Sequence, residues 1–527
     1  MKNLLFCFLL IGLFSACQGT KAPQEETTQR PNILFAIADD ASFPHMSAYG
    51  CTWVNTPAFD EVASKGLLFQ NAFTPNAKCA PSRAIILTGR NSWQLEEAAN
   101  HVPYFPKKFK TIFEALKEHG YLTGHVAKGY APGNPGEIDG QPRELVGKAY
   151  NDIKLTPPTT AISNTDYAAN FASFLKEREA GQPFCFWYGS LEPHRAYEYG
   201  TGQRLGGKSP ADLDGVFPFF PDVDSVRQDI LDYAFEIEHF DAHLGKMLET
   251  LKAKGELDNT LVIVTADNGM PFPRIKGQVY ESSNHLPLAI MWGNRIKEPG
   301  RVIDEFVSFA DFAPTFLDAA GIDQEASGMQ AFEGHSLVDL MQNERSTPFR
   351  SHMLIGKERH DIGRPNDWGY PVRGIRTEKY LFLINFKPER WPAGNPETGY
   401  LNCDGSPTKS VILHQRRYQN EDFFWNLAFG KRPAEELYDL LADPHCMNNL
   451  VGKADYSDIK ERLKNQLLNE LKEQQDPRAM GNGDVFDNYT YAHERHRNFY
   501  ERFQNGEITP ESAGWVNEDD FEKSKLD

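Results

Sequence analysis

Two pairs of oxygen-bearing side chains stand directly after apolar runs of the sequence. Asp39 and Asp40 follow one run, and Asp267 and Asn268 follow another. Carboxylate and amide oxygens are the ligands of a hard cation, and several carboxylates in a flexible cage suit calcium better than magnesium. Adjacent aspartates can also cap a helix without binding metal. Because the pattern recurs at a second run, we expect one calcium ion here, able to polarise an anionic ester.

The segment 78–90 has the most specific pattern in the chain. It reads Lys-Cys-Ala-Pro-Ser-Arg, then an apolar stretch, then Leu-Thr-Gly-Arg. This string resembles the signature of the formylglycine-dependent sulfatases. In that family the cysteine, here Cys79, is oxidised to an aldehyde by a maturation enzyme, and the resemblance implies the same modification here. The alternative is that Cys79 is an ordinary buried thiol.

A hydrated aldehyde at Cys79 would carry two hydroxyl groups on one carbon. One hydroxyl could attack sulfur, and loss of the second proton could then expel sulfate and restore the carbonyl. A helix N-terminus suits this group because free backbone amides and the helix dipole favour an anion. Arg83, one turn further on, is expected to hold the activated hydroxyl and a metal-bound oxygen.

Three further cations match positions that contact the sulfate or the leaving oxygen in the sulfatase family. They are Lys128, His194 and Lys276. Such groups would neutralise charge on the sulfuryl oxygens, and His194 could protonate the leaving group. Taken singly, each could instead be a solvated surface charge.

One position departs from the family pattern. Sulfatases usually carry histidine two residues after the lysine that corresponds to Lys128, where this chain has Tyr130. The resemblance implies that this side chain contacts the aldehyde hydrate. Tyr130 must therefore replace the histidine as a hydrogen-bonding phenol or leave the site altered.

Finer motifs resemble the heparan sulfamidase branch of the family. They lie at residues 192–195, 267–273, 370–373, 436–439 and 443–445. This resemblance implies a sulfated, glucosamine-containing saccharide as substrate, with galactose or N-acetylglucosamine sulfates as alternatives. It also implies that a second domain supplies sugar-binding residues. The candidates are Arg195, Arg359, His360 and Arg373. The arginine forks could bind a carboxylate or a second sulfate, but they could equally form structural salt bridges.

The elements that must position these residues are four apolar runs with helical patterns between them. The runs 32–38, 121–127, 183–189 and 261–266 are apolar at nearly every position, which is typical of parallel strands buried on both faces. The carboxyl ends of parallel strands meet at one edge of a sheet, so the polar residues should converge there. We predict an α/β fold with a mostly parallel central sheet flanked by helices, which the resemblance makes alkaline-phosphatase-like.

Helix signals support this alternation. Thr111 and Glu114 form a capping box, Thr56 with Pro57 opens another helix, and a long amphipathic helix should begin at Ser225. Beyond about residue 345, short aromatic runs and a charged helix predict a smaller α+β subdomain with an antiparallel sheet. The expected domains are a signal peptide (1–17), a tether (18–30), a catalytic domain (31–345), a subdomain completing the pocket (346–475) and an extension of unknown role (476–527).

The first residues predict export. An apolar run too short to span a bilayer ends in small residues before Cys17, the pattern of a lipoprotein signal in which Cys17 carries the lipid anchor. The alternative is an ordinary cleaved signal. We therefore expect an exported protein, in the periplasm or on the outer membrane of a Gram-negative bacterium.

Composition limits the remaining classes. The net charge of −18 argues against nucleic acid as a partner, so an anionic substrate needs a local cationic pocket. No Cys/His spacing suits zinc, and the five cysteines after Cys17 cannot all pair with one another. Two rival functions stay open: a phosphate or phosphonate ester hydrolase of the same superfamily, and a non-catalytic lipoprotein that binds sulfated glycan.

Overall fold

The computed structural model describes residues 30–344, 347–348 and 350–526. The predicted signal peptide, most of the tether and the lipid anchor on Cys17 lie outside these residues. No helix in the described part of the chain combines the length and the apolar character needed to cross a bilayer. The five cysteines of this part are all free thiols.

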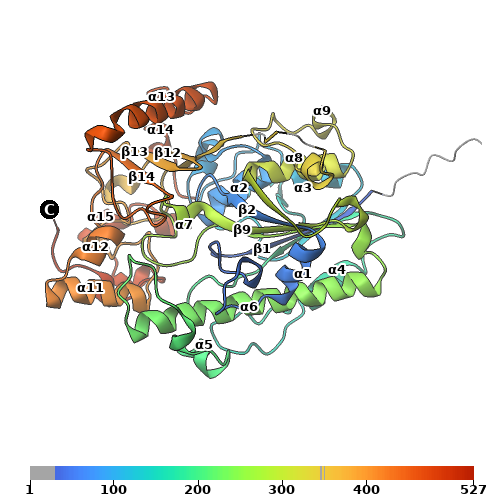
Figure 1. Cartoon of the computed structure of the whole chain (residues 1–527), viewed down its shortest axis with the longest axis horizontal. Helices are drawn as coiled ribbons and strands as arrows, with labels where there is room; N and C mark the ends of the chain where they lie inside the picture. The colour runs from blue at the N-terminus through green and yellow to red at the C-terminus, as the bar shows by residue number, and fades with distance from the viewer. Residues whose placement is uncertain (1–29, 345–346, 349, 527) are drawn as a thin grey trace, which may run out of the picture.

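An eight-stranded sheet forms the centre of the molecule, in the order β10-β2-β9-β8-β1-β7-β3-β6. Strand β9 is antiparallel to both of its neighbours, and the other pairs are parallel. The predicted, mostly parallel sheet is thus confirmed (Figure 1). The strands are β1 Asn32–Ala38, β2 Leu67–Phe73, β3 Leu122–Ala127, β6 Lys148–Ala149, β7 Phe184–Gly189, β8 Thr260–Ala266, β9 His285–Met291 and β10 Arg301–Ser308.

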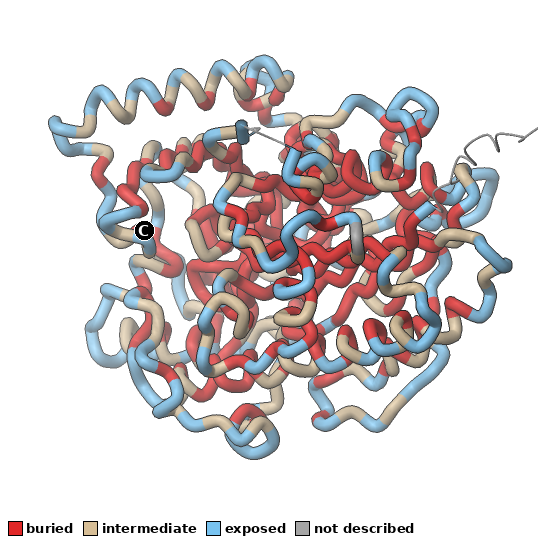
Figure 2. Tube along the Cα trace, turned by 45° about the vertical axis from the view of Figure 1, so that its right-hand side comes forward, coloured by how far each residue is buried: buried red, intermediate tan, exposed pale blue. Residues whose placement is uncertain are grey.

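Helices cover both faces of this sheet. In β1, Leu34 and Ala36 belong to one apolar core, while Ile33 and Phe35 belong to the other. Because successive side chains of a strand point to opposite faces, burial on both sides requires a run without polar residues. Figure 2 shows the buried centre that results. One face carries α1 Pro57–Lys65, α4 Tyr167–Phe174 and α6 Asp224–Ala253, and the other α2 Cys79–Thr88, α3 Ile112–Glu118 and α8 Phe312–Ala319.

The helix signals of the sequence are confirmed with small shifts. At the start of α3, Thr111 Oγ1 accepts from the Glu114 amide at 3.3 Å, and Glu114 accepts from the Thr111 amide at 2.8 Å. Helix α1 begins at Pro57, as the Thr-Pro pair indicates. Helix α6 begins at Asp224, one residue before the predicted Ser225.

The predicted second unit has a four-stranded antiparallel sheet in the order β11-β12-β13-β14. Helix α13, Ser457–Glu473, packs on it through Leu463, Leu467 and Leu471, which are spaced four residues apart and are fully buried. The strands are β11 His352–Lys357, β12 Val372–Thr377, β13 Tyr380–Asn385 and β14 Glu435–Asp439; α11 Pro407–Gln419 and α12 Phe423–Ala428 precede β14.

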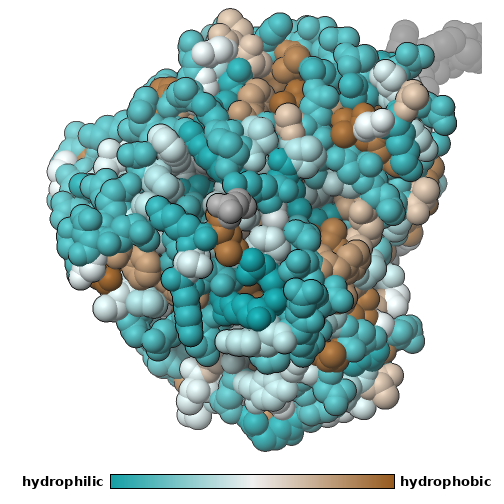
Figure 3. All heavy atoms as spheres, turned by 90° about the vertical axis from the view of Figure 1, so that its left-hand side faces the viewer, coloured by the Kyte–Doolittle hydropathy of each residue, from teal (hydrophilic) through white to brown (hydrophobic). Residues whose placement is uncertain are grey.

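The segment 476–526 folds back onto both units. It contains α14 Val485–Asn488 and α15 Phe499–Gln504. Tyr491 and Phe499 are buried together with Val102 and Leu401, which come from distant parts of the chain. The face of the molecule shown in Figure 3 is mostly hydrophilic, with apolar residues in small scattered groups.

Candidate active site

The two oxygen-bearing pairs lie side by side at the carboxyl ends of neighbouring strands. Strands β1 and β8 are paired in register up to Ala38 and Ala266, so Asp39 and Asp267 leave the sheet together. The amide of Asp40 donates to Asp267 Oδ1 at 3.0 Å. Asp40 has φ 74, a left-handed conformation that turns the chain sharply at the strand end. All three carboxylates are buried.

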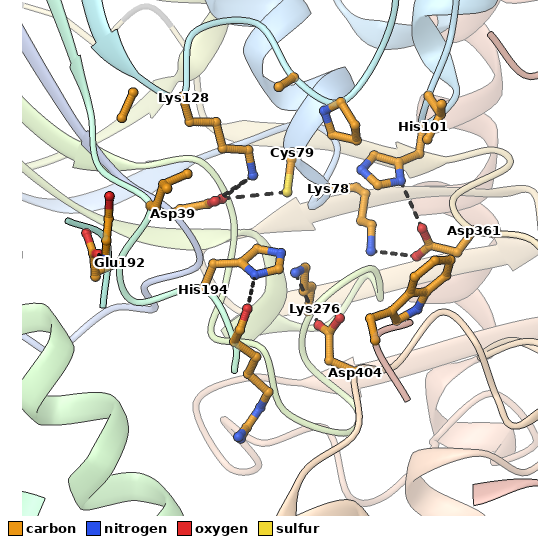
Figure 4. Close-up of a pocket in the computed structure, with 18 of the residues that line it drawn as sticks. Asp39, Lys78, Cys79, His101, Lys128, Glu192, His194, Lys276, Asp361 and Asp404 are labelled. Atoms are coloured by element: carbon orange, nitrogen blue, oxygen red, sulfur yellow. Dashed lines mark hydrogen bonds and ion pairs between the residues drawn. The ribbon is translucent and has the colours of Figure 1, made fainter. Parts of the chain in front are cut away.

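Cys79 is the first residue of α2, and its side chain faces these carboxylates. Its Sγ lies 3.7 Å from Asp39 Oδ1 and 3.9 Å from Asp40 Oδ1 (Figure 4). Arg83, one helical turn on, donates from Nε to Asp267 Oδ2 at 2.9 Å and from Nη1 to the Lys128 carbonyl at 2.6 Å. The helix therefore brings the modifiable cysteine and a fully buried guanidinium to the same strand ends.

Two ammonium groups and an imidazole complete this cluster. Lys128 Nζ donates to Asp39 Oδ1 at 2.7 Å, and Lys276 Nζ donates to Asp40 Oδ2 at 2.6 Å. His194 Nε2 lies 3.9 Å from Asp40 Oδ2. The structure thus brings these three side chains to the predicted oxygen cluster, each opposite one of its aspartates.

Burial and crowding set the charges of this cluster. Burial raises the pKa of the Cys79 thiol, and the neighbouring carboxylates add to the effect, so an unmodified cysteine would stay protonated. Burial would lower the pKa of Lys276, but Asp40 and Asp404 outweigh it and hold that pKa well above its usual value. Lys276 therefore stays charged beside the carboxylates.

The donor atoms of this cluster fit a hard cation. Ligand atoms of Asp39, Cys79 and Asp267 all lie within 4.8 Å of one another. Asn268 donates from Nδ2 to Asp40 Oδ1 at 2.6 Å, and no described residue forms a hydrogen bond with its buried Oδ1. An unsatisfied buried carbonyl oxygen among carboxylates is a ready ligand for such an ion. The thiol stands where the modified side chain would place an oxygen.

A cavity of about 670 Å³ opens beside the cluster. Lys78, His101, Asp361 and Asp404 line it, and sequence reasoning missed all four. Asp361 accepts from Lys78 Nζ at 2.6 Å and lies 2.9 Å from His101 Nδ1 (Figure 4). Asp404 lies 3.1 Å from Lys276 Nζ. Only Lys78 had a sequence signal, its place directly before Cys79, since the others come from loops without a motif.

Of the predicted sugar-binding residues, the structure brings only Arg195 to the cavity wall. Its guanidinium is held by Asp229 in a two-pronged ion pair of 2.7 and 2.9 Å. It also lies 4.4 Å from the centre of the Phe272 ring. Arg195 therefore shapes the wall with its charge already neutralised.

Arg359, His360 and Arg373 do not line the cavity, which corrects the sequence-based expectation. Arg373 is buried between Asp476 and Glu358, both at 2.8 Å. His360 Nε2 lies 2.9 Å from Asn76 Oδ1. Arg359 stacks on Tyr491 at 3.8 Å from the ring centre. Arg373 and His360 are therefore bound by protein side chains, and Arg359 is held by packing and by a hydrogen bond from Nη1 to the Tyr489 carbonyl.

Tyr130 also lies outside the cavity lining. Its ring packs edge-on against Phe105, with 5.0 Å between the ring centres, and its buried hydroxyl has no hydrogen-bond partner among the described residues. The phenol does not take up a hydrogen-bonding place beside Cys79. His101, from another loop, is one of the imidazoles that line the cavity together with Lys78 and Lys128.

Solved structures share this fold at low sequence identity. A complex with D-glucosamine-2-N,6-O-disulfate has a TM-score of 0.59 at 22% identity, covering 85% of this chain and 99% of that one. The phosphonate monoester hydrolase of Agrobacterium radiobacter has a TM-score of 0.59 at 20% identity, covering 85% and 97%. The alkaline-phosphatase-like architecture expected from the sequence is confirmed.

Relatives and family models agree with this fold. Human N-sulphoglucosamine sulphohydrolase is 27% identical over 85% of this chain and 91% of its own length. An N-acetylglucosamine-6-O-sulfatase of Bacteroides thetaiotaomicron is 25% identical, over 86% and 88%. A model described as "N-sulphoglucosamine sulphohydrolase, C-terminal" matches residues 275–392. A model described as "Sulfatase" matches residues 31–322, more than half of the chain, and this protein therefore belongs to the sulfatase family.

Proposed function

We propose that this sulfatase removes sulfate from a glucosamine-containing saccharide with a formylglycine formed from Cys79. The observation that carries the proposal is the place of this side chain. It begins α2 with Sγ less than 4 Å from two aspartates and with Arg83 one turn away. A buried thiol that stays protonated is a poor nucleophile there, whereas an oxygen at the same point would join an all-oxygen ligand set.

Two groups supply the chemistry that the unmodified chain lacks. One calcium ion would be held by Asp39, Asp40, Asp267, Asn268 and the modified side chain, and its Lewis acidity would polarise the sulfuryl group. A formylglycine at position 79 would supply the nucleophile as its hydrate: one hydroxyl could displace the sugar from sulfur, and the second could let sulfate leave as the carbonyl is restored. One water molecule is consumed overall, because the aldehyde is then hydrated again.

The remaining cations hold charge and move a proton. Arg83 fixes Asp267 and thereby the orientation of the ligand set. Lys128 and Lys276 face the position of the sulfuryl oxygens and neutralise the charge that spreads over them. His194, half-buried at the cavity wall, donates the proton that the leaving oxygen or nitrogen needs.

The proposed substrate class follows from the relatives. Two of them are named for glucosamine sulfates, and the structure complex holds a glucosamine disulfate. Another relative is an ulvan-active sulfatase of Formosa agariphila, which is 27% identical over 88% of this chain and 87% of its own length. Because of this relative, a different sulfated glycan is the alternative substrate. We also propose that the chain is exported and anchored to a membrane through Cys17, after a maturation enzyme has oxidised Cys79.

A substrate panel tests this proposal. Protein matured in a host with the formylglycine-forming enzyme is incubated with N-, 3-O- and 6-O-sulfated glucosamines, sulfated galactose and a phosphonate monoester, with and without calcium. We expect sulfate release from a glucosamine derivative only when calcium is present. Sulfate release from sulfated galactose alone would support another sulfated glycan as the substrate. Cleavage of the phosphonate monoester alone would support a phosphonate ester hydrolase. Saccharide binding without any turnover would favour a glycan-binding lipoprotein.

A further inference from the structure

The segment after α14, which lies beyond both family matches, supplies one wall of the cavity. The wall residues are His493, Arg495, His496 and Trp515. We call this group the C-terminal wall. It lies near Asp361, whose charge acts on His496 and which also binds Lys78, the residue before Cys79. The wall therefore borders the space that a saccharide would fill next to the reacting group.

The C-terminal wall is fixed in place by backbone and indole hydrogen bonds. Trp515 Nε1 donates to the Leu401 carbonyl at 3.0 Å, and the Gly405 amide donates to the Trp515 carbonyl at 2.8 Å. The Ala492 amide donates to the Val102 carbonyl at 2.9 Å. These bonds join the segment to the second unit and to the loop that carries His101. A wall held in this way is preorganised for a ligand.

Two members of the wall have polar groups without protein partners. His496 is 7% exposed, and neither of its ring nitrogens has a hydrogen-bond partner among the described residues. Arg495 is exposed and forms no ion pair with any described acid. Its neighbour Glu494 lies 3.8 Å from Arg497 instead. Asp361 is already bound by Lys78 and His101.

We propose that the C-terminal wall is a binding subsite for a second anionic group, a sulfate or a carboxylate, carried by the saccharide. This inference rests on the proposed function. Arg495 would bind that group with its guanidinium fork, and His496 would donate one further hydrogen bond. The indole of Trp515 would pack against the apolar face of a sugar ring.

Charge argues for an anion rather than a neutral hydroxyl. The chain has a net charge of −18, yet the four residues of the C-terminal wall include an arginine and no acid. The pKa of His496 is lowered to about 4 by burial and by Arg495 and His493, so it is neutral at pH 7 and adds no charge of its own. Arg495 would therefore supply the charge and His496 a directed donor.

The test compares two substrates in the same enzyme. One is a glucosamine sulfate monosaccharide, and the other is a disaccharide in which a uronate that carries a second sulfate is attached to the same sugar. We expect R495A to lower the ratio of kcat/KM for the disaccharide to kcat/KM for the monosaccharide by about tenfold or more, the effect of losing a charge-assisted hydrogen bond. R495K should lose part of that factor, because it keeps the charge without the fork.

Two arms name the anion, and one variant is the control. In one arm the uronate carboxyl is reduced, and in the other the second sulfate is removed. The effect of R495A should disappear in the arm that removes the anion bound by Arg495. Arg462 is an exposed arginine on α13 away from the cavity, and R462A should leave the ratio unchanged. An unchanged ratio in R495A, or an equal fall in R462A, would overturn the subsite.

A binding measurement separates this inference from the proposed function. In protein with Cys79→Ala, which cannot turn over substrate, calorimetry with the disaccharide should show about tenfold weaker binding when R495A is added. If no sugar loses sulfate but this difference is seen, the proposed function fails and the subsite stands. If sulfate is released and the difference is absent, the subsite fails alone.

Discussion

The two ends of the cavity differ in how their charges are satisfied. At the strand ends, Lys128, Lys276 and Arg83 each contact a buried aspartate within 3 Å. At the C-terminal wall, both ring nitrogens of the buried His496 have no hydrogen-bond partner among the described residues, and the exposed Arg495 forms no ion pair with any described acid. The first end is an interlocked set of charges whose geometry is determined by the protein. The second has donors that no described side chain satisfies and that a ligand could bind.

This difference indicates that the strand ends catalyse the reaction and that the C-terminal wall discriminates between substrates. Interlocked charges can stabilise a transition state without reorganising, because their positions are fixed before substrate arrives. Free donors at the rim contribute to binding and discriminate between ligands. We therefore expect changes at the strand ends to lower kcat, and changes at the wall to alter the relative KM of different sugars.

Removing the metal or one of its ligands should have the largest effect. D267N, or chelation of the wild-type enzyme, should lower sulfate release by at least about 10³-fold, because Lewis-acid polarisation contributes several kcal/mol. Added calcium should restore the chelated wild type and raise its Tm, while D267N should show neither response. Full activity in the chelated enzyme would contradict the proposed role of these carboxylates.

Arg373 tests whether a predicted sugar-binding residue is structural. It is buried between Asp476 and Glu358. Breaking such a pair leaves buried charge uncompensated, so R373M should lower the free energy of unfolding by about 3–5 kcal/mol. Urea-induced unfolding measures this change, and KM of the folded enzyme should stay the same. A large rise in KM without loss of stability would show that Arg373 binds substrate.

Lys128 tests the interlocked end directly. K128M should lower kcat by about 10²–10³-fold, as for loss of one preorganised group that stabilises transition-state charge. Lys254 is exposed at the end of α6 and does not line the cavity, so K254M is the matched control. Steady-state kinetics on one sulfated monosaccharide compares the two variants. An effect on KM alone would assign Lys128 to uniform substrate binding instead.

A smaller effect concerns stability in acid. His45 is 4% exposed, and burial lowers its pKa from 6.5 to about 3. The unfolded chain then binds the extra proton, so this contribution to stability is complete above pH 6.5 and is lost as the pH falls toward 3. The slope amounts to about 1.4 kcal/mol per pH unit within that window. H45Q should flatten the dependence of Tm on pH between 6 and 4, and an unaltered slope would contradict this assignment.

The smallest effect is expected at Tyr130. Its buried hydroxyl has no hydrogen-bond partner in the described part of the chain, so Y130F should change the free energy of unfolding by less than about 1 kcal/mol. Because the phenol does not line the cavity, kcat/KM should stay within about twofold of the wild type. A tenfold loss in sulfate release would show that the hydroxyl acts on the reaction after all.

The sequence could predict what is local or periodic. Apolar runs such as 32–38 indicated the buried strands, and the polar residue after each run pointed to the convergence of Asp39 and Asp267. Asp361 and His101 could not be foreseen, because they meet only when the second unit packs on the first. The same limit explains Arg373: sequence alone does not show whether an arginine faces a cavity or the two carboxylates that neutralise it.

The most direct test of the central claim relates modification to activity. Preparations matured to different extents are digested, and the mass of the peptide that contains position 79 gives the fraction of chains with the aldehyde. Sulfate release from a glucosamine sulfate is then measured for each preparation with calcium present. The account predicts a rate that is proportional to the converted fraction and reaches zero when every Cys79 is a thiol. Sulfate release by the unconverted chain, or none by the fully converted chain, would contradict it.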